Sequence, residues 1–374
     1  MFSRRIEIQW PLNSTHLRFL LSFLIFELSF LIAYRYAMGV NPRTGAPFWL
    51  PDSVLLCVLL LSRPRTWFIY LAATLPLRLV VAVPPDTPMW FLLAAFANDS
   101  LKALVAATLV RRFLPGRGIR FERLHDFWTY LAAAVVLAPA LSAVAGAASW
   151  MALGREFWPV WCNWFLGDAL PNLLITPLLL CLALDWRKFI KARPMRFFEG
   201  AVVFSGMFFA TQFAFSWDVN NPQILDLHAY IPMVFLLWAA VRFGVAGASG
   251  SLAIMSLLSI TAAAARLPAV LDDTAGILSV QLFLIVIGVP IMSLSVLIAQ
   301  HQKTEHSLRE SEDRFRNMAD TAPVMIVVLD TNGEQLFSTS GGWILPVARW
   351  NKNWARVGRL VCIPLIGKTT SSDS

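Results

Sequence analysis

Long apolar runs, separated by short polar segments, fill the chain from Leu17 to about Gln300. A helix needs roughly 20 mainly apolar residues to cross the core of a bilayer, and runs of that kind recur along this sequence. The pattern predicts about ten helices, several of them short or interrupted by proline: residues 17–36, 48–61, 67–83, 89–110, 127–153, 158–184, 197–215, 231–245, 252–265 and 277–299. We therefore expect an all-α polytopic membrane bundle of about eight to ten transmembrane helices over residues 15–300.

The tail changes character directly after Gln300. Residues 301–318 are rich in charge and contain neither glycine nor proline. Five residues fall near a seven-residue repeat: Leu297, Thr304, Leu308, Phe315 and Met318. This pattern predicts a helical signalling linker that continues the last membrane helix and pairs with a second copy as a homodimer. An unpaired amphipathic connector is the alternative.

A strand pattern follows the linker. Residues 324–329 form a short apolar run, residues 330–333 contain an Asn-Gly turn, and residues 334–337 begin a second strand. Strand, turn and strand indicate a β-hairpin. Residues 338–374 show no strand or helix pattern and end in a polar stretch, so we expect them to be a non-native tail.

Composition excludes a soluble globular protein. The chain is 57% hydrophobic and only 14% charged, which leaves too few polar groups to cover a water-exposed surface. Its formal charge of +8 comes from Lys and Arg in short segments between the apolar runs. The excess of basic residues therefore reflects positive charge in the loops. It predicts a lipid bilayer as the partner and no nucleic acid.

The distribution of basic residues predicts the topology, because cytoplasmic loops are enriched in Lys and Arg. Alternate segments, residues 4–5, 63–65, 111–123 and 187–196, carry the basic residues, whereas residues 84–88 and 217–221 carry none. The exceptions are single charges at Arg43, Arg155 and Arg266. We expect a multi-pass protein of a bacterial cell inner membrane with cytoplasmic N- and C-termini.

Polar side chains within the apolar runs are costly to place in lipid and mark candidate sites. These are Glu27, Asp52, Asn98, Asp99, Lys102, Asn163, Asp168, Asn172, Arg242 and Gln281. Asp99 and Lys102 are three residues apart on one helix and are close enough to pair, and Asp168 and Asn172 share another helical face. Two interpretations stay open: a polar cavity that binds a small ligand or responds to protonation, and hydrogen bonding between helices. For Glu27 and Gln281 the second is favoured.

The aromatic residues and histidines do not indicate a ligand-binding or metal site. Trp161 and Trp164 are more typical of an interfacial belt than of a ligand cage. The five histidines are scattered, without the spacing of metal ligands. We expect no metal, no cofactor and no catalytic residues.

Three segments resemble the MASE1 membrane sensor domain of bacteria across roughly residues 15–300. They are Phe48-Trp-Leu-Pro-Asp-Ser-Val54, Asn98-Asp-Ser-Leu-Lys102, and Trp161-Cys-Asn-Trp-Phe-Leu-Gly-Asp-Ala-Leu-Pro171 with its nearby Thr176-Pro177. The resemblance implies a sensory, signal-transducing protein with candidate sensing residues Asp52, Asn98, Asp99, Lys102, Trp161, Trp164, Asp168 and Asn172. A secondary transporter or channel for a small solute is the alternative.

Residues 311–323 and the hairpin after them resemble the start of a PAS domain, assigned to residues 319–337. In such proteins a PAS domain precedes an output module, commonly a histidine kinase or a diguanylate cyclase. The chain shows no motif of either, so we expect no enzyme activity and a truncated input half. Residues 337–358 can be back-translated so that another reading frame spells the PAS continuation Asn-Lys-x-Trp-Leu-x-Phe-Thr-Gly-Arg. This indicates a frameshift near Phe337.

Overall fold

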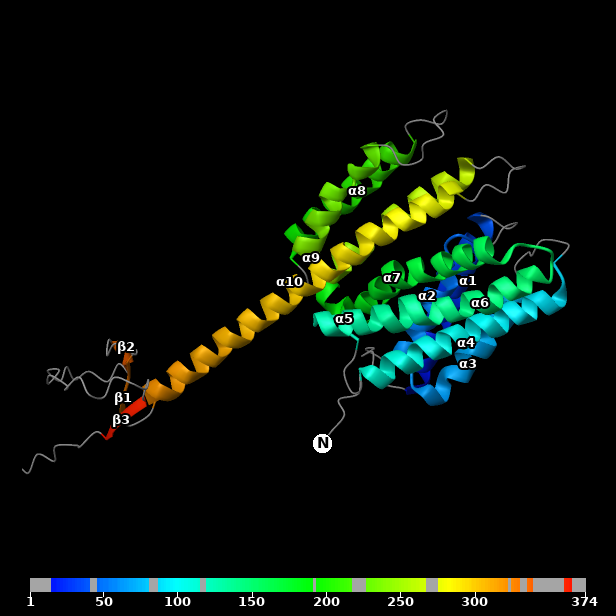
Figure 1. The fold of residues 1–374 in the computed structure, drawn as a ribbon. Helices are drawn as coiled ribbons and strands as arrows, with labels where there is room; N and C mark the ends of the chain where they lie inside the picture. Colours follow the sequence, from blue (N-terminus) through cyan, green and yellow to red (C-terminus); the bar gives the residue numbers. More distant parts are fainter. Residues whose placement is uncertain are drawn as a thin grey trace, which may run out of the picture. The chain divides into compact units, whose positions relative to one another are not determined.

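The computed structural model describes residues 15–40, 46–80, 87–114, 119–190, 193–216, 227–266, 275–321, 324–329, 335–338 and 360–364. The chain divides into two units, residues 1–300 and 301–374. The first unit is helical throughout its described part, and Figure 1 shows its helices side by side.

The first half of this unit contains two long and two short helices. The long helices are α1, Thr15–Val40, and α4, Met89–Phe113. Between them lie α2, Leu50–Leu61, the 3₁₀ turn η1, Pro64–Thr66, and α3, Trp67–Val80. At 1.5 Å per residue, the 12 residues of α2 and the 14 of α3 span only about 18 and 21 Å. Neither reaches across a core of about 30 Å by itself.

The next crossing is a helix with a π-helical middle. It consists of α5, Leu124–Tyr130, the π segment η2, Leu131–Leu137, and α6, Ala138–Met151. Pro139 is the second residue after the π segment and has no N–H to donate. The helix α7, Phe157–Ile190, packs against α2, α6 and α9 and is the most buried of the long helices.

The last helices of the first unit are α8, Pro194–Ser216, the 3₁₀ turn η3, Leu227–Tyr230, and α9, Met233–Arg266. Gly244 interrupts α9 with φ of 62° and ψ of −145°. A Cβ on Gly247 would lie 2.4 Å from the carbonyl oxygen of Ala239, although residues eight apart in a straight helix are about 12 Å apart along the axis. The chain therefore turns sharply at Gly244, and the predicted helices 231–245 and 252–265 are the two arms of α9.

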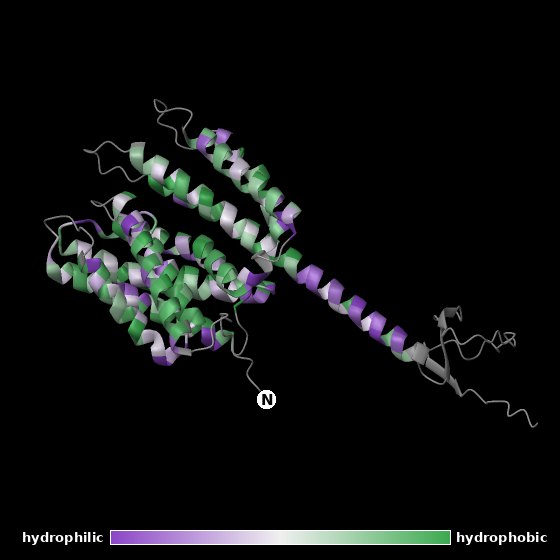
Figure 2. Ribbon diagram, turned by 180° about the vertical axis from the view of Figure 1, so that it is seen from behind, coloured by the Kyte–Doolittle hydropathy of each residue, from purple (hydrophilic) through white to green (hydrophobic). Residues whose placement is uncertain are grey.

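The final helix, α10, runs without a break from Ala275 to Thr321. Figure 2 shows its change from hydrophobic residues to a largely hydrophilic stretch. The predicted helical linker at residues 301–318 is thus a continuation of the last apolar helix, and all of its residues are exposed. Its pairing with a second copy stays a prediction.

Seven of the described helices are long and apolar enough to span a bilayer. The sequence predicted about eight to ten. The difference arises because α2 and α3 are too short, and because the two arms of α9, which the turn at Gly244 separates, count together as one apolar stretch of the chain. The outer surface is apolar: Leu28 and Ile32 of α1 are each 61% exposed, while Phe30 between them is fully buried. A water-soluble fold would not leave such a surface uncovered, so the first unit is a multi-pass membrane domain.

In its described residues the second unit contains three short strands in the order β2-β1-β3, with both pairings antiparallel: β1, Val324–Leu329, β2, Gln335–Ser338, and β3, Leu360–Pro364. β1 and β2 lie in the segment with the strand–turn–strand pattern; the turn itself lies outside the described residues. The prediction that residues 338–374 hold no strand is wrong for β3, which pairs with β1 through its apolar residues. Three short strands do not define a PAS domain, and that assignment stays a prediction.

Candidate functional site

Lys102 lies at the centre of a group of buried charged side chains. Its Nζ forms ion pairs with Asp52 of α2, with Asp99 of α4 at 3.1 Å, and with Asp168 of α7 at 2.5 Å. These residues are at most 4% exposed. The pairing of Asp99 with Lys102 was predicted from their spacing; the convergence of Asp52 and Asp168 on the same ammonium group was not.

Arg78 of α3 brings a second cation. Its Nη2 donates a hydrogen bond to Oδ2 of Asp99 at 2.7 Å. The guanidinium carbon lies 5.7 Å from the ring centroids of Tyr34 and Trp49 and 5.8 Å from that of Phe96. At these distances a cation is attracted to an aromatic ring. We refer to Asp52, Arg78, Asp99, Lys102 and Asp168 as the charge cluster.

The charge cluster is not electrically balanced. Three carboxylates face one ammonium and one guanidinium group, which leaves a formal charge of −1. Oδ2 of Asp52 is held by the ammonium group of Lys102, whereas Oδ1 accepts no hydrogen bond within the described residues. The hydroxyl groups of Ser53 and Ser142 also lack partners there. Buried polar groups without partners are costly, so the cluster has both the charge and the open acceptors to take up a positively charged group.

Asp52 reaches the cluster because α2 begins inside the bundle. Pro51 and Asp52 lie in its first turn and are buried, and the preceding non-helical residues Pro47 and Phe48 are buried as well. Non-helical backbone at membrane depth is tolerated only where protein covers it. Here Gln281 of α10 donates from Nε2 to the carbonyl oxygen of Pro47 at 2.6 Å.

Gly167 and Pro171 of α7 hold the same loop. Pro171 has no N–H, so it cannot bond to the carbonyl oxygen of Gly167 one turn earlier. That oxygen accepts instead from the backbone N–H of Trp49 at 2.8 Å. A Cβ on Gly167 would lie 3.0 Å from the carbonyl oxygen of Ala46, so the close approach favours glycine. Asp168 is the next residue after Gly167, so the same contact positions its carboxylate beside Lys102.

Asn172 lies outside the charge cluster, although it shares a helical face with Asp168. Its Nδ2 donates to the carbonyl oxygen of Ala134 in η2 at 3.2 Å. In the π pattern the N–H of Ala138 bonds to Ala133, and Pro139 offers none to Ala134. Asn172 thus replaces a missing backbone donor, which is the helix-to-helix bonding that the sequence left open for it.

The side chains of the other three predicted sensing residues contact residues of α6 or α7. Asn98 donates from Nδ2 to the carbonyl oxygen of Ser142 in α6 at 3.1 Å, which joins α4 to α6. The ring of Trp161 stacks on Phe165 with centroids 5.3 Å apart. The ring of Trp164 covers Gly146, where an added Cβ would lie 2.3 Å from it. Among the described residues, none of the three forms a hydrogen bond, an ion pair or a ring contact with the charge cluster.

Two further polar residues of the apolar runs lie outside the charge cluster. Arg242 has an exposed side chain that pairs with Glu199 at 2.7 Å. Glu27 is half-buried, and its Oε1 has no partner among the described residues. The residue that sequence reasoning missed is Arg78. A signal existed, because it is the one charged residue in the apolar run 67–83.

The segments that resemble MASE1 therefore meet at one place. Phe48–Val54 supplies Asp52, residues 98–102 supply Asp99 and Lys102, and residues 161–171 supply Asp168. The family model of MASE1 matches residues 18–302. The chain belongs to the MASE1 family. This match covers the MASE1 domain alone, and neither the curated proteins nor the solved structures contain a match to the chain.

The chemistry available to this MASE1 domain is ionic. Within the described residues, no group of three or more His, Cys, Asp or Glu is placed to hold a metal ion. The three carboxylates instead share Lys102. A positive charge added to the cluster or removed from it therefore changes which carboxylates Lys102 pairs with.

Proposed function

We propose that this chain is the sensory input module of a signalling protein in a bacterial inner membrane, and that the charge cluster is its sensing site. The observation that carries the proposal is the excess carboxylate: Asp52 is buried, its Oδ1 has no hydrogen-bond partner within the described residues, and it shares the ammonium group of Lys102 with Asp99 and Asp168. Buried ion pairs add little stability compared with well-packed apolar residues. A buried charge cluster whose formal charges do not cancel therefore indicates a functional role. Buried charges in membrane helices generally mark functional sites.

The stimulus is a proton or a small positively charged ligand that reaches the open side of Asp52. Such a charge competes with Lys102 for the carboxylate and releases the ammonium toward Asp99 and Asp168. Because Asp52 lies on α2 and Asp168 on α7, this exchange changes the attraction between the two helices. Two arrangements of the bundle, with populations set by occupancy, are sufficient for a switch.

The output passes through α10. Gln281 of α10 bonds to the loop before α2, and Oε1 of Gln300 accepts from the backbone N–H of Leu124 at the start of α5 at 2.9 Å. Both contacts respond to movement of the bundle around the charge cluster. We expect α10 to carry this movement into the cytoplasm as part of a homodimer, toward a histidine kinase or a diguanylate cyclase.

The test uses residues 1–321 fused to a diguanylate cyclase domain, with cyclic di-GMP as the readout. The variant Asp52→Asn removes the excess charge and is expected to hold the output at one level across external pH and across small amines. Arg242→Gln, at the exposed ion pair with Glu199, is the matched control and is expected to respond like the parent. Equal responses of the two variants would exclude the charge cluster as the sensing site.

The cytoplasmic side of the C-terminus is tested separately. A reporter fused after Gln300 is expected to be active only in the cytoplasm, because the Arg-rich segment at residues 187–196 is predicted to lie there and four helical segments, α8, the two arms of α9 and α10, separate it from Gln300. Periplasmic activity would overturn the sensor assignment. The PAS assignment and the frameshift near Phe337 are tested by sequencing the coding DNA, which is expected to spell the PAS continuation in a shifted frame.

A transporter or channel is the second candidate, favoured by the broken helices. α2 begins in the bundle interior, and α9 is interrupted at Gly244; discontinuous helices of this kind line binding sites in transporters. Solute flux into liposomes that contain the purified chain distinguishes the two. Reproducible uptake that Lys102→Met abolishes would favour transport.

A further inference from the structure

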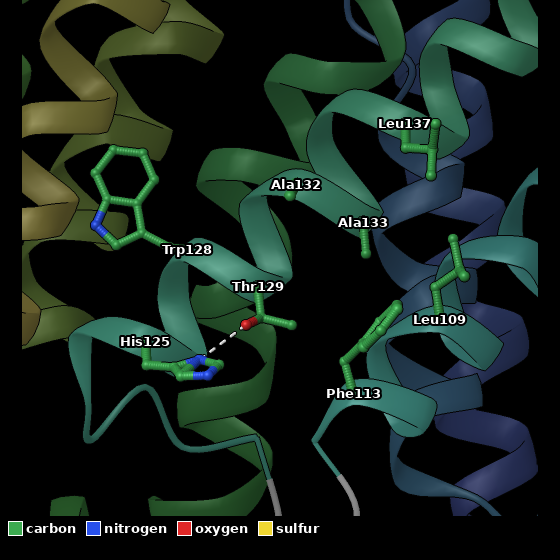
Figure 3. Close-up of a pocket in the computed structure, with 8 residues that line it drawn as sticks. All are labelled: Leu109, Phe113, His125, Trp128, Thr129, Ala132, Ala133 and Leu137. Atoms are coloured by element: carbon green, nitrogen blue, oxygen red, sulfur yellow. Dashed lines mark hydrogen bonds between the residues drawn. The ribbon is translucent and has the colours of Figure 1, made fainter.

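A pocket of about 460 Å³ lies between the end of α4 and the π-helical segment η2 (Figure 3). Its apolar part is lined by Leu109 and Phe113 of α4 and by Ala132, Ala133 and Leu137 of η2. The two alanines leave the space open, because larger side chains there would fill it. The volume is in the range of small-molecule pockets, roughly 300–1,000 Å³.

The few polar atoms of the lining gather at the other end of this pocket. His125 and Thr129 of α5 line it and share a hydrogen bond of 3.0 Å, drawn as the dashed line in Figure 3. Trp128, which also lines the pocket, is 46% exposed. Tryptophan favours the boundary between lipid and water. The pocket is therefore apolar along most of its length, and His125, Trp128 and Thr129 mark the end at the membrane surface, an arrangement that suits the chain of an amphiphile.

Two arginines adjoin the lining residues of this end in the chain, beside the acidic residues Glu122 and Asp126. Arg112 is three residues from Leu109 and so lies on the same side of α4, and Arg123 lies two residues before His125. Both are exposed, and within the described part of the chain neither pairs with a carboxylate. The neighbouring Arg111 is different, since its Nη2 donates to backbone carbonyl groups at the end of α2 at 2.9 Å.

We propose that this pocket binds an anionic phospholipid from the surrounding bilayer. One acyl chain lies along Leu109, Phe113 and Leu137, and the phosphate lies between Arg112 and Arg123. A zwitterionic lipid fills the apolar part equally well but gains less from the two guanidinium groups, because its own cation opposes them. Basic pockets between helices at the cytoplasmic surface are suited to anionic headgroups.

The test is native mass spectrometry of the purified full chain in detergent, titrated with dioleoyl-phosphatidylglycerol or dioleoyl-phosphatidylcholine. We expect tighter binding of the anionic lipid. Arg112→Gln with Arg123→Gln is expected to weaken it roughly thirtyfold, at about fivefold for each basic residue, and to bring the two lipids to similar affinity. This double variant leaves the apolar part intact and therefore does not depend on repacking.

A second pair of variants tests the pocket itself. Ala132→Phe fills it and is expected to abolish retention of phosphatidylglycerol. Val136→Phe places the same ring on an exposed position of η2 outside the pocket and is expected to have no effect. Equal affinity of the parent chain for the two lipids would overturn the headgroup assignment, and equal binding by Ala132→Phe and Val136→Phe would overturn the pocket.

Discussion

Replacing Lys102 with methionine tests how strongly the charge cluster depends on its central cation. The substitution keeps a long apolar stem and removes one charge. Three ion pairs are lost, and the formal charge of the cluster falls from −1 to −2. Asp52 and Asp168 then have no cation within 4 Å among the described residues.

The expected cost follows from burial. The side chains of Lys102 and its three partners are at most 3% exposed, and breaking a buried pair by removing one member typically costs about 3–5 kcal/mol. We expect Lys102→Met to lower the free energy of unfolding by about that amount. The measurement is unfolding of the purified chain in mixed micelles by titration with sodium dodecyl sulfate, followed by circular dichroism.

Arg242→Gln is the control, since it removes a cation from an ion pair of 2.7 Å whose Arg242 side chain is 52% exposed. Exposed pairs contribute about 0–1 kcal/mol. The double variant Lys102→Met with Asp168→Asn restores the charge of −1 and is expected to recover part of the loss. If Lys102→Met costs no more than Arg242→Gln, the ion pairs are not the reason that the helices meet there.

Three further substitutions test backbone features by the same unfolding titration. Gly167→Val places a side chain against the loop before α2 and is expected to cost about 1–3 kcal/mol through displacement of that loop. Asn172→Leu leaves the carbonyl oxygen of Ala134 without its side-chain donor and is expected to cost about 1–3 kcal/mol; an unchanged unfolding midpoint would show that the π segment does not need it. Gly244→Ala forces a side chain into a positive-φ conformation and is expected to cost about 1–3 kcal/mol, whereas Gly39→Ala, in open space on α1, is expected to be neutral or stabilising.

Hydrophobic periodicity predicted the helices well because a bilayer imposes both length and composition on each crossing. It was less successful where tertiary contacts replace lipid. The run 48–61 reads as a short crossing, but its first residues are non-helical and are buried by α7 and α10, through Gly167 and Gln281. A composition rule cannot distinguish a helix that starts at the membrane surface from one that starts inside the bundle.

The sequence predicted which polar residues are site candidates, but it did not predict which residue each of them contacts. Spacing on one helix was enough to pair Asp99 with Lys102, because helical geometry alone determines neighbours three residues apart. The same argument placed Asn172 beside Asp168, yet the two side chains have different partners, since Asn172 is needed by a carbonyl group that Pro139 leaves unpaired.

The sequence by itself determined that the chain is a helical membrane protein, which loops carry charge, and that costly polar groups lie within its helices, because each of these follows from the transfer of residues between water and lipid. Only the tertiary structure decided that Arg78 belongs with Asp99 and that Lys102 joins Asp168, pairs that are 21 and 66 residues apart. Contacts between helices depend on how whole faces pack, and that packing is a property of the assembled bundle.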